Sequence, residues 1–186
     1  MAYKNFLTYI QDGIRNNWNC EAMTDIGGET VTYAILAERI EKIHIILEAA
    51  GVRKQDKVAI YAKNSVNWGV AFLGASTYEA TVVPLLSDFT PESASQLIGH
   101  SDSVVLFTDS SRFGKMDIGG MPSLKAVLDI SDFSLLYNGV GERLGSTGEN
   151  IDSLFLGKFY AFGPKDINYP ADNFDDIDLI NYTSRT

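Results

Sequence analysis

The chain has 186 residues, of which 45% are hydrophobic, and it carries a formal net charge of −9. This composition predicts one globular domain with a sizeable core, and the acidic charge argues against nucleic acids and anionic membrane surfaces as partners. A lone cysteine, Cys20, excludes a disulfide framework within the chain. The sequence shows neither a signal peptide nor an apolar run long enough for a transmembrane segment, and we therefore expect a cytoplasmic protein.

Residues 1–52 are expected to form a helix–hairpin–helix segment. Apolar side chains at helical spacing in Tyr3–Trp18 predict an amphipathic helix. The Gly27-Gly28 pair suits the tight turn of a two-stranded hairpin in Glu21–Tyr33. A second helix is expected over Tyr33–Ala50, stopped by the glycine that follows it. Its buried stripe is predicted to consist of Leu36, Ile40, Ile43 and Leu47.

Residues 53–186 are expected to form an α/β subdomain, because short apolar strands alternate there with helices. Ser65 and Thr90 are suited to cap two of these helices. Gly69 and Gly74 would let the first of these helices lie close to a sheet. Continuous apolar strands between helices predict an α/β fold with an open, mostly parallel sheet and helices on both faces, preceded by the N-terminal helix and β-hairpin. The strands are predicted around Val58, Thr81, Val104, Ala126 and Leu179.

The stretch between the last two predicted strands is less regular. Asp129–Gly148 is expected to be a loop, and Asn150–Phe162 is expected to be a helix. Within the loop, the glycines of Gly139–Gly145 resemble a dinucleotide-binding fingerprint, but the third glycine comes one position late and no clear strand precedes the first. We therefore expect no nucleotide site in this loop.

No complete catalytic set is apparent in the sequence. His44 lies beside an apolar stripe and is expected to be structural rather than a metal ligand, and His100 is the other histidine. Ser110 and Ser111 follow a strand without an assignable base, so a surface turn is expected there. An acidic group near the C-terminus lacks the spacing of a calcium loop, and a solvated loop is expected instead. Its members are Asp172, Asp175, Asp176 and Asp178.

The C-terminal residues combine a short apolar strand with hydroxyl side chains. Leu179 and Ile180 are followed by Tyr182, Thr183 and Ser184. Ligands of open parallel sheets bind beyond the carboxyl ends of the strands, and hydroxyl groups with free backbone N–H groups suit a phosphate-binding turn. The sequence therefore predicts phosphate binding at this end of the chain.

Several motifs, taken in order, resemble the adenylate-forming or AMP-binding enzymes, the superfamily of acyl-CoA synthetases, luciferases and peptide-synthetase adenylation domains. Tyr182-Thr183-Ser184 is similar to the start of the signature Tyr-Thr-Ser-Gly-Thr-Thr-Gly-x-Pro-Lys-Gly, although Arg185 stands at a glycine position. Residues 51–60 are similar to Gly-Val-x-x-Gly-Asp-x-Val-Ala-Ile, with Gln55 in place of the second glycine. Weaker similarities over most of the chain are Thr32-Tyr33 with Leu36, Asn64-Ser65, Trp68, Val83-Pro84-Leu85 and His100-Ser101.

The resemblance implies an ATP-dependent acyl-CoA ligase that uses Mg²⁺ and coenzyme A and converts a fatty acid or another carboxylate into an acyl-adenylate and then a thioester. The long-chain fatty-acid CoA ligases resemble the chain most closely. The resemblance also implies a nucleotide-binding loop of which the chain holds Tyr182, Thr183, Ser184 and Thr186, and a chain that is truncated inside that loop. We expect such an N-terminal fragment to be catalytically incomplete, with no catalytic residue or metal ligand of its own and no tight binding of these ligands.

Two alternatives stay open at this stage. The chain could be a stand-alone flavodoxin-like module that binds a small molecule or a protein, or a structural subunit that interacts through its apolar N-terminal helix. A coding sequence that continues as Gly-x-Pro-Lys-Gly would decide for the fragment. In a fragment, residues 1–52 should lack part of their apolar cover and should self-associate, most simply as a dimer.

Overall fold

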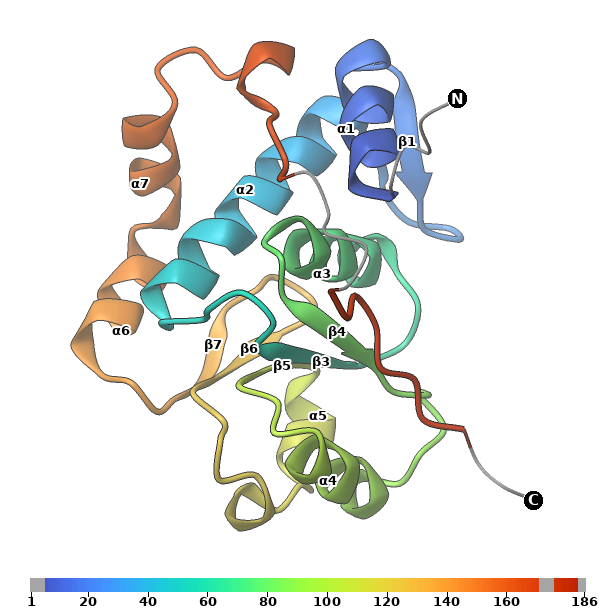
Figure 1. The fold of residues 1–186 in the computed structure, drawn as a ribbon, viewed down its shortest axis with the longest axis vertical. Coiled ribbons are helices and arrows are strands. Elements are labelled where there is room, and N and C mark those ends of the chain that lie inside the picture. The colour runs from blue at the N-terminus through green and yellow to red at the C-terminus, as the bar shows by residue number, and fades with distance from the viewer. Residues whose placement is uncertain (1–5, 171–175, 184–186) are drawn as a thin grey trace.

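The computed structural model describes residues 6–170 and 176–183, which form a central sheet between two layers of helices (Figure 1). The five strands of this sheet have the order β4-β3-β5-β6-β7. β3, β4, β5 and β6 are parallel, and β7 pairs antiparallel with β6. The predicted α/β fold is therefore confirmed. The strands are β3 (Lys57–Tyr61), β4 (Thr81–Pro84), β5 (Val105–Thr108), β6 (Ala126–Asp129) and β7 (Leu135–Asn138).

The N-terminal residues form the predicted helix, hairpin and helix. These elements are α1 (Phe6–Asn16), β1 (Glu21–Thr24), β2 (Thr30–Thr32) and α2 (Tyr33–Ala49). Thr32 caps α2, because its side-chain oxygen accepts a hydrogen bond from the Ile35 N–H at 3.3 Å. Gly27 has a φ of 70°, a conformation that glycine adopts without the strain of a Cβ atom.

The remaining helices begin largely where the sequence predicts. Ser65 caps α3 through the Trp68 N–H at 3.0 Å, and Thr90 caps α4 through the Ser93 N–H at 3.2 Å. Over residues 6–170 and 176–183, no helix is long and apolar enough to cross a membrane. The helices are α3 (Val66–Thr77), α4 (Pro91–His100), α5 (Ser110–Phe113), α6 (Glu142–Glu149) and α7 (Ile151–Lys158), with short 3₁₀ turns at Ile118–Gly120 and Pro164–Asp166.

Two hydrophobic cores lie on opposite faces of the sheet. Alternate residues of a strand point to opposite faces. In β3, Val58 and Ile60 accordingly join the core that includes α2 and α3, whereas Ala59 and Tyr61 join the core beneath α4. Figure 1 shows α2 and α3 on one side of the sheet and α4 and α5 on the other. Burial on both faces explains why the strands read as continuous apolar runs.

The glycines of α3 allow close contacts with the N-terminal elements. A Cβ atom at Gly74 would lie 2.9 Å from Cβ of Ile43 and 2.7 Å from its Cγ2, so this glycine permits close packing of α3 on α2. A Cβ atom at Gly69 would lie 2.8 Å from the sulfur of Met23 in the hairpin. Gly69 therefore lies close to the two-stranded β1–β2 sheet, as expected of a helix packed near a sheet, whereas Gly74 allows contact with a helix, so that expectation is wrong for Gly74.

The predicted loop Asp129–Gly148 contains a strand and a helix. β7 pairs with the edge of β6 after a tight turn in which Phe133 has a φ of 62°. The turn is stabilised by Asp129, which accepts hydrogen bonds from the Ser131 N–H at 2.9 Å and the Ser131 hydroxyl at 2.7 Å. β7 is short and has no alternating pattern, so its pairing partner rather than its local sequence makes it a strand.

The predicted strand at Leu179 is reduced to a single parallel bridge with Val82 at the outer edge of β4. The fifth strand of the sheet is β7 at the opposite edge. The predicted helix over Asn150–Phe162 is shorter, because α7 ends at Lys158. Beyond it, Phe159 and Phe162 pack against Phe155 with ring centroids 5.2 and 5.0 Å away.

The apolar stripe of α2 is covered within the chain. Its four predicted members are each at most 2% exposed, and α3, α6 and α7 pack around α2. In α1, by contrast, Tyr9 is 62% exposed and Ile10 is half-buried. The expected lack of cover is therefore wrong for the α2 stripe. Self-association through residues 1–52 stays a prediction, with α1 as the surface that could support it.

Candidate functional site

The residues that lead toward the predicted phosphate-binding turn run along the outer edge of β4. We name Asp176–Thr183 the approach segment; in Figure 1 it is the red chain beside β4. The Val82 N–H donates to the Asp178 carbonyl oxygen at 2.9 Å, and the Ile180 N–H donates to the Val82 carbonyl oxygen at 2.9 Å. These bonds place the segment parallel to β4, in the direction that the sequence predicts for a strand there.

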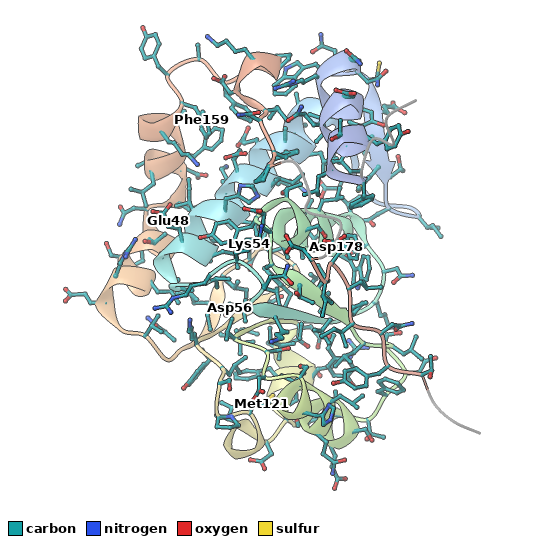
Figure 2. All side chains as sticks on the ribbon, viewed as in Figure 1. Glu48, Lys54, Asp56, Met121, Phe159 and Asp178 are labelled. Atoms are coloured by element: carbon teal, nitrogen blue, oxygen red, sulfur yellow. The ribbon has the colours of Figure 1, made fainter. Side chains whose placement is uncertain are left out.

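Side chains from the loops before β3 and β4 hold the start of the approach segment. Lys54 pairs with Glu79 at 2.7 Å and with Asp176 at 2.9 Å, and these carboxylates raise the pKa of Lys54. The Ile177 N–H donates to Oε1 of Gln55 at 3.0 Å. Figure 2 shows Lys54 near this end of the segment. Three kinds of contact, namely ion pairs, a side-chain acceptor and the β4 backbone, therefore meet within a few residues.

The acidic group predicted as a solvated loop is only partly covered by the described residues. Asp172 and Asp175 lie outside them. Asp176 takes part in the ion pair with Lys54, and Asp178 is exposed. In residues 6–170 and 176–183, no three His, Cys, Asp or Glu side chains come together in a way that could hold a metal ion.

The other end of the approach segment rests on α4. The Tyr182 hydroxyl and Nδ1 of His100 are 2.8 Å apart, and the two rings meet edge-on with centroids 5.9 Å apart. Partial burial, together with the nearby Asp102 carboxylate, raises the pKa of Tyr182. Thr183 follows and is exposed. Of the four predicted nucleotide-binding residues, Tyr182 and Thr183 are thus placed by the structure, whereas Ser184 and Thr186 lie outside the described residues, as does Arg185.

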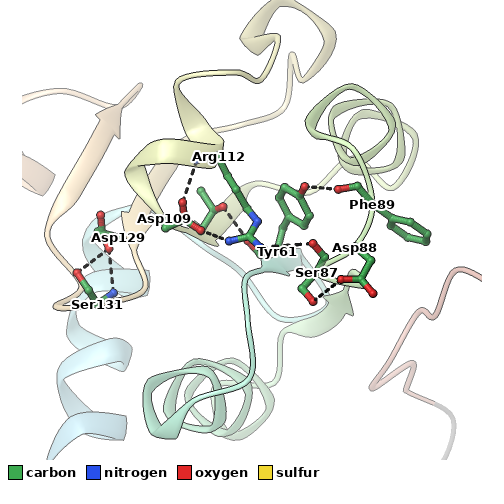
Figure 3. Close-up of polar contacts among 9 residues, drawn as sticks. Tyr61, Ser87, Asp88, Phe89, Asp109, Arg112, Asp129 and Ser131 are labelled. Carbon is green, nitrogen blue, oxygen red and sulfur yellow. Dashed lines mark hydrogen bonds and ion pairs between the residues drawn. The ribbon is translucent and has the colours of Figure 1, made fainter. Parts of the chain in front are cut away.

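A polar cluster that was not predicted from the sequence closes the carboxyl ends of β3 and β5 (Figure 3). The guanidinium of Arg112 lies over the Tyr61 ring, 5.3 Å from its centroid, and pairs with Asp109. The Tyr61 hydroxyl donates to the Phe89 carbonyl oxygen, and the Thr108 hydroxyl donates to the Tyr61 carbonyl oxygen at 2.7 Å. These bonds tie the loops after three adjacent strands together.

The positive charge of Arg112 is balanced within this cluster by the Asp109 carboxylate. Burial tends to raise the pKa of Asp109, but hydrogen bonds from Arg112 outweigh it and lower that pKa overall. A cavity of about 360 Å³ lies beside the pair and is also lined by Lys63 and Ser65. The spacing of Asp109 and Arg112 at i and i+3, with the aspartate as an N-cap, was the signal that could have identified the pair in the sequence. Ser110 and Ser111 are the exposed first residues of the short helix α5.

The glycine-rich segment Gly139–Gly145, which follows β7, is held by hydrogen bonds within the chain. A strand does precede it, and α6 follows it, so the expectation of no leading strand is wrong. However, Oδ1 of Asn138 already accepts from the Val140 N–H at 3.1 Å and the Gly141 N–H at 2.9 Å. Glu142 adds a negative charge in the first turn of α6. Two N–H groups of this segment are thus used in hydrogen bonds, and Glu142 would repel a phosphate. The absence of a nucleotide site here stays a prediction.

His44 lies where α2 contacts α3 and is partly exposed. Its Nε2 lies 2.8 Å from the Thr77 hydroxyl oxygen, and this hydroxyl donates to the Leu73 carbonyl oxygen at 2.7 Å. Because the single hydroxyl proton of Thr77 is used in that bond, His44 must donate from Nε2. Its contacts in the described residues and its partial exposure fit the expected structural or partly exposed histidine.

Comparison with known proteins identifies the family. Residues 11–186 match the family described as AMP-binding enzyme, and the chain belongs to that family. The expected resemblance is thereby confirmed. The approach segment is consistent with this assignment, because it runs parallel to β4 toward the carboxyl ends of the strands, where ligands of open parallel sheets bind.

Named relatives are acyl-CoA ligases. A medium/long-chain-fatty-acid–CoA/3-oxocholest-4-en-26-oate–CoA ligase of Mycolicibacterium smegmatis is 29% identical over 58% of this chain and 20% of its own length. An acetyl-coenzyme A synthetase of Emericella nidulans is 30% identical over 63% of this chain and 18% of its own length. The crystal structure of an anthranilate CoA ligase in complex with anthranoyl-AMP shares the fold with a TM-score of 0.75 at 16% identity, over 100% of this chain and 32% of that one. The chain thus spans between about a fifth and a third of the length of these relatives.

Proposed function

We propose that the chain forms the N-terminal part of an ATP-dependent acyl-CoA ligase. The observation that carries the proposal is the family match over residues 11–186, which ends in an approach segment fixed to the sheet edge. In the proposed reaction, a carboxylate oxygen attacks the α-phosphorus of ATP, and the bond to pyrophosphate breaks. The sulfur of coenzyme A then attacks the acyl carbon, and AMP leaves. This sequence yields a thioester, AMP and pyrophosphate.

The described residues would contribute binding rather than proton transfer to this reaction. Tyr182 and Thr183, together with Ser184 and Thr186, are the proposed nucleotide-binding residues. The Thr183 hydroxyl is exposed and could donate to a phosphate oxygen. Mg²⁺ commonly keeps several waters and is bound partly through substrate phosphates, and we assign it to the nucleotide rather than to a cage of side chains.

The acyl chain is proposed to be a long-chain fatty acid. The medium/long-chain ligase among the relatives supports this choice, whereas the acetyl-coenzyme A synthetase shows that a short acyl group occurs at comparable identity. This choice is tested in the full-length protein by measuring the acyl-dependent exchange of labelled pyrophosphate into ATP with acetate, octanoate or palmitate. Exchange with palmitate above the other two supports it, and exchange with acetate alone contradicts it. A cytoplasmic location is proposed as well, since a lone cysteine fits a reducing compartment.

Thr183 provides a direct test of the nucleotide site. In the full-length protein, Thr183→Val removes the hydroxyl but keeps the shape of the side chain. The loss of a hydrogen bond to a charged phosphate should raise the KM for ATP about tenfold or more. Thr183→Ser is the matched control, because it retains the hydroxyl, and its KM for ATP should stay close to that of the unsubstituted protein. Equal KM values for the Val and Ser variants would contradict this role for Thr183.

The polypeptide of residues 1–186 is expected to show no ligase activity by itself. The described residues bring together no nucleophile, general base and metal-binding group. Pyrophosphate exchange with ATP, Mg²⁺ and the same acids should therefore match a blank without enzyme. Clear turnover by the purified polypeptide would contradict this expectation and would show that the acyl and nucleotide sites lie within these residues.

A further inference from the structure

Gln55 adopts a backbone conformation that its side chain makes costly. Its φ is 65°, in the left-handed region that glycine adopts freely and other residues seldom do. Its own N–H donates to the Glu79 carbonyl oxygen at 2.8 Å, which fixes the turn before β3. A glycine would satisfy the same backbone contact without the strain. The side chain of Gln55 therefore needs a reason of its own.

The Gln55 side chain accepts a hydrogen bond from one of the two backbone polar groups of Ile177. The Ile177 N–H donates to Oε1 of Gln55 at 3.0 Å, and the Ile177 carbonyl oxygen accepts from the Thr81 hydroxyl at 2.6 Å. The β4 backbone takes over at the next residues through Val82 alone. An isolated bridge makes far fewer backbone hydrogen bonds than a strand. Side-chain contacts therefore contribute more to fixing the position of this segment along β4.

His100 holds the opposite end in the same way. The chain leaves β4 after Ile180, and its next contact with a side chain at hydrogen-bond distance is that of Tyr182 with His100 at 2.8 Å. Tyr182 also packs against the core beneath α4. Thr183 follows directly, so the position of its hydroxyl depends on where Tyr182 is held.

We propose that Gln55 and His100 are positioning residues, which tether the two ends of the approach segment and thereby set where Thr183 meets the nucleotide. This inference rests on the proposed function of Thr183. Neither residue contacts the nucleotide in this arrangement. Their action is indirect, through Ile177 and Tyr182.

Gln55→Gly separates positioning from general stability. The substitution removes the side-chain acceptor and also relieves the left-handed strain, so the midpoint of urea unfolding should stay the same or rise. Amide exchange at Ile177, measured by NMR in the full-length protein, should nevertheless become about tenfold faster, the change expected when one hydrogen bond is lost. The affinity for ATP, measured by calorimetry, should fall.

His100 is tested at the other end with two variants. His100→Ala removes the partner of Tyr182 and should weaken ATP binding severalfold, while His100→Asn places a polar atom close to the position of Nδ1 and should restore most of it. Gln96→Ala, on the same helix and also exposed, is the matched control and should bind ATP as the unsubstituted protein does.

The outcomes separate this inference from the proposed function. Unchanged Ile177 exchange in Gln55→Gly, or unchanged ATP affinity in both Gln55→Gly and His100→Ala, would overturn the positioning role while the function stands. An unsubstituted full-length protein that binds no ATP would overturn the proposed function and the inference with it. Faster exchange together with weaker ATP binding and an unlowered unfolding midpoint supports the inference, because a merely structural role would also lower the midpoint.

Discussion

The imidazole of His44, whose side chain is 14% exposed, makes the stability of the protein depend on pH. Burial disfavours its charged form, and the nearby Lys158 ammonium adds to this effect, so the pKa falls from 6.5 to about 3. The groups that face His44 from its own and neighbouring elements are Glu41, Lys158, Tyr78 and Tyr169. In the folded protein, His44 therefore stays neutral throughout the mildly acidic range.

The direction of the effect follows from proton binding. Below pH 6.5 the unfolded chain binds a proton at His44, whereas the folded chain does not until the pH approaches 3. Because the unfolded state binds more protons in this window, the free energy of unfolding falls as the pH falls. At pH 5 the pKa difference favours the unfolded state about 30-fold, which corresponds to about 2 kcal/mol. Well above pH 6.5 neither state binds this proton, so His44 no longer lowers the free energy of unfolding.

His44→Gln isolates this contribution. The amide nitrogen of Gln lies close to the position of Nε2 and can donate to the Thr77 hydroxyl, but it does not titrate. Urea unfolding at pH 7.5 and pH 5.0 gives the loss of stability for each protein. The loss should be about 2 kcal/mol larger with histidine than with glutamine. Glu41, whose pKa burial raises, acts in the opposite direction but is present in both proteins.

Equal losses in the two proteins would refute the reasoning. They would show that His44 is either charged in the folded protein or as exposed there as in the unfolded chain. If the His44→Gln protein fails to fold at pH 7.5, a second measurement uses the Thr77→Ser protein, which keeps both His44 and its hydroxyl partner. Two-dimensional NMR titration of the His44 ring in that protein reports the pKa of His44 directly. A ring that titrates near 6.5 would give the same refutation.

Three further predictions concern packing and assembly. Gly74→Ala should destabilise the fold by about 1–3 kcal/mol in urea unfolding, because the new methyl group meets Ile43, and Ile43→Ala in the same chain should make that substitution far less costly. Gly13→Ala, in α1 with nothing within 4 Å of the new methyl group, should instead stabilise by about 0.5–1 kcal/mol; a loss of stability there would contradict the described α1. Sedimentation of the residue 1–186 polypeptide at micromolar concentration should show a dimer, and Tyr9→Lys on the exposed face of α1 should restore the monomer; a monomer without this substitution would contradict self-association through residues 1–52.

The sequence by itself determined the elements whose signals are local. The cap residues Thr32, Ser65 and Thr90 mark their helix starts because a side-chain oxygen next to the first turn satisfies backbone N–H groups that have no other partner. The apolar strands before residue 130 were equally clear, since strands buried on both faces of a parallel sheet cannot alternate with polar residues. The order of motifs also identified the family, and the match over residues 11–186 confirmed it.

The tertiary structure alone decided which weak segments became strands and how the candidate site is held. Leu135–Asn138 and Ile177–Ile180 are similarly short, yet only the first is paired along its length, because β6 offers it a free edge immediately after a tight turn. The second reaches β4 from far along the chain, and side chains such as Gln55 supply the contacts that the backbone ladder lacks. Such contacts join residues more than a hundred positions apart, and no periodicity in a sequence records them.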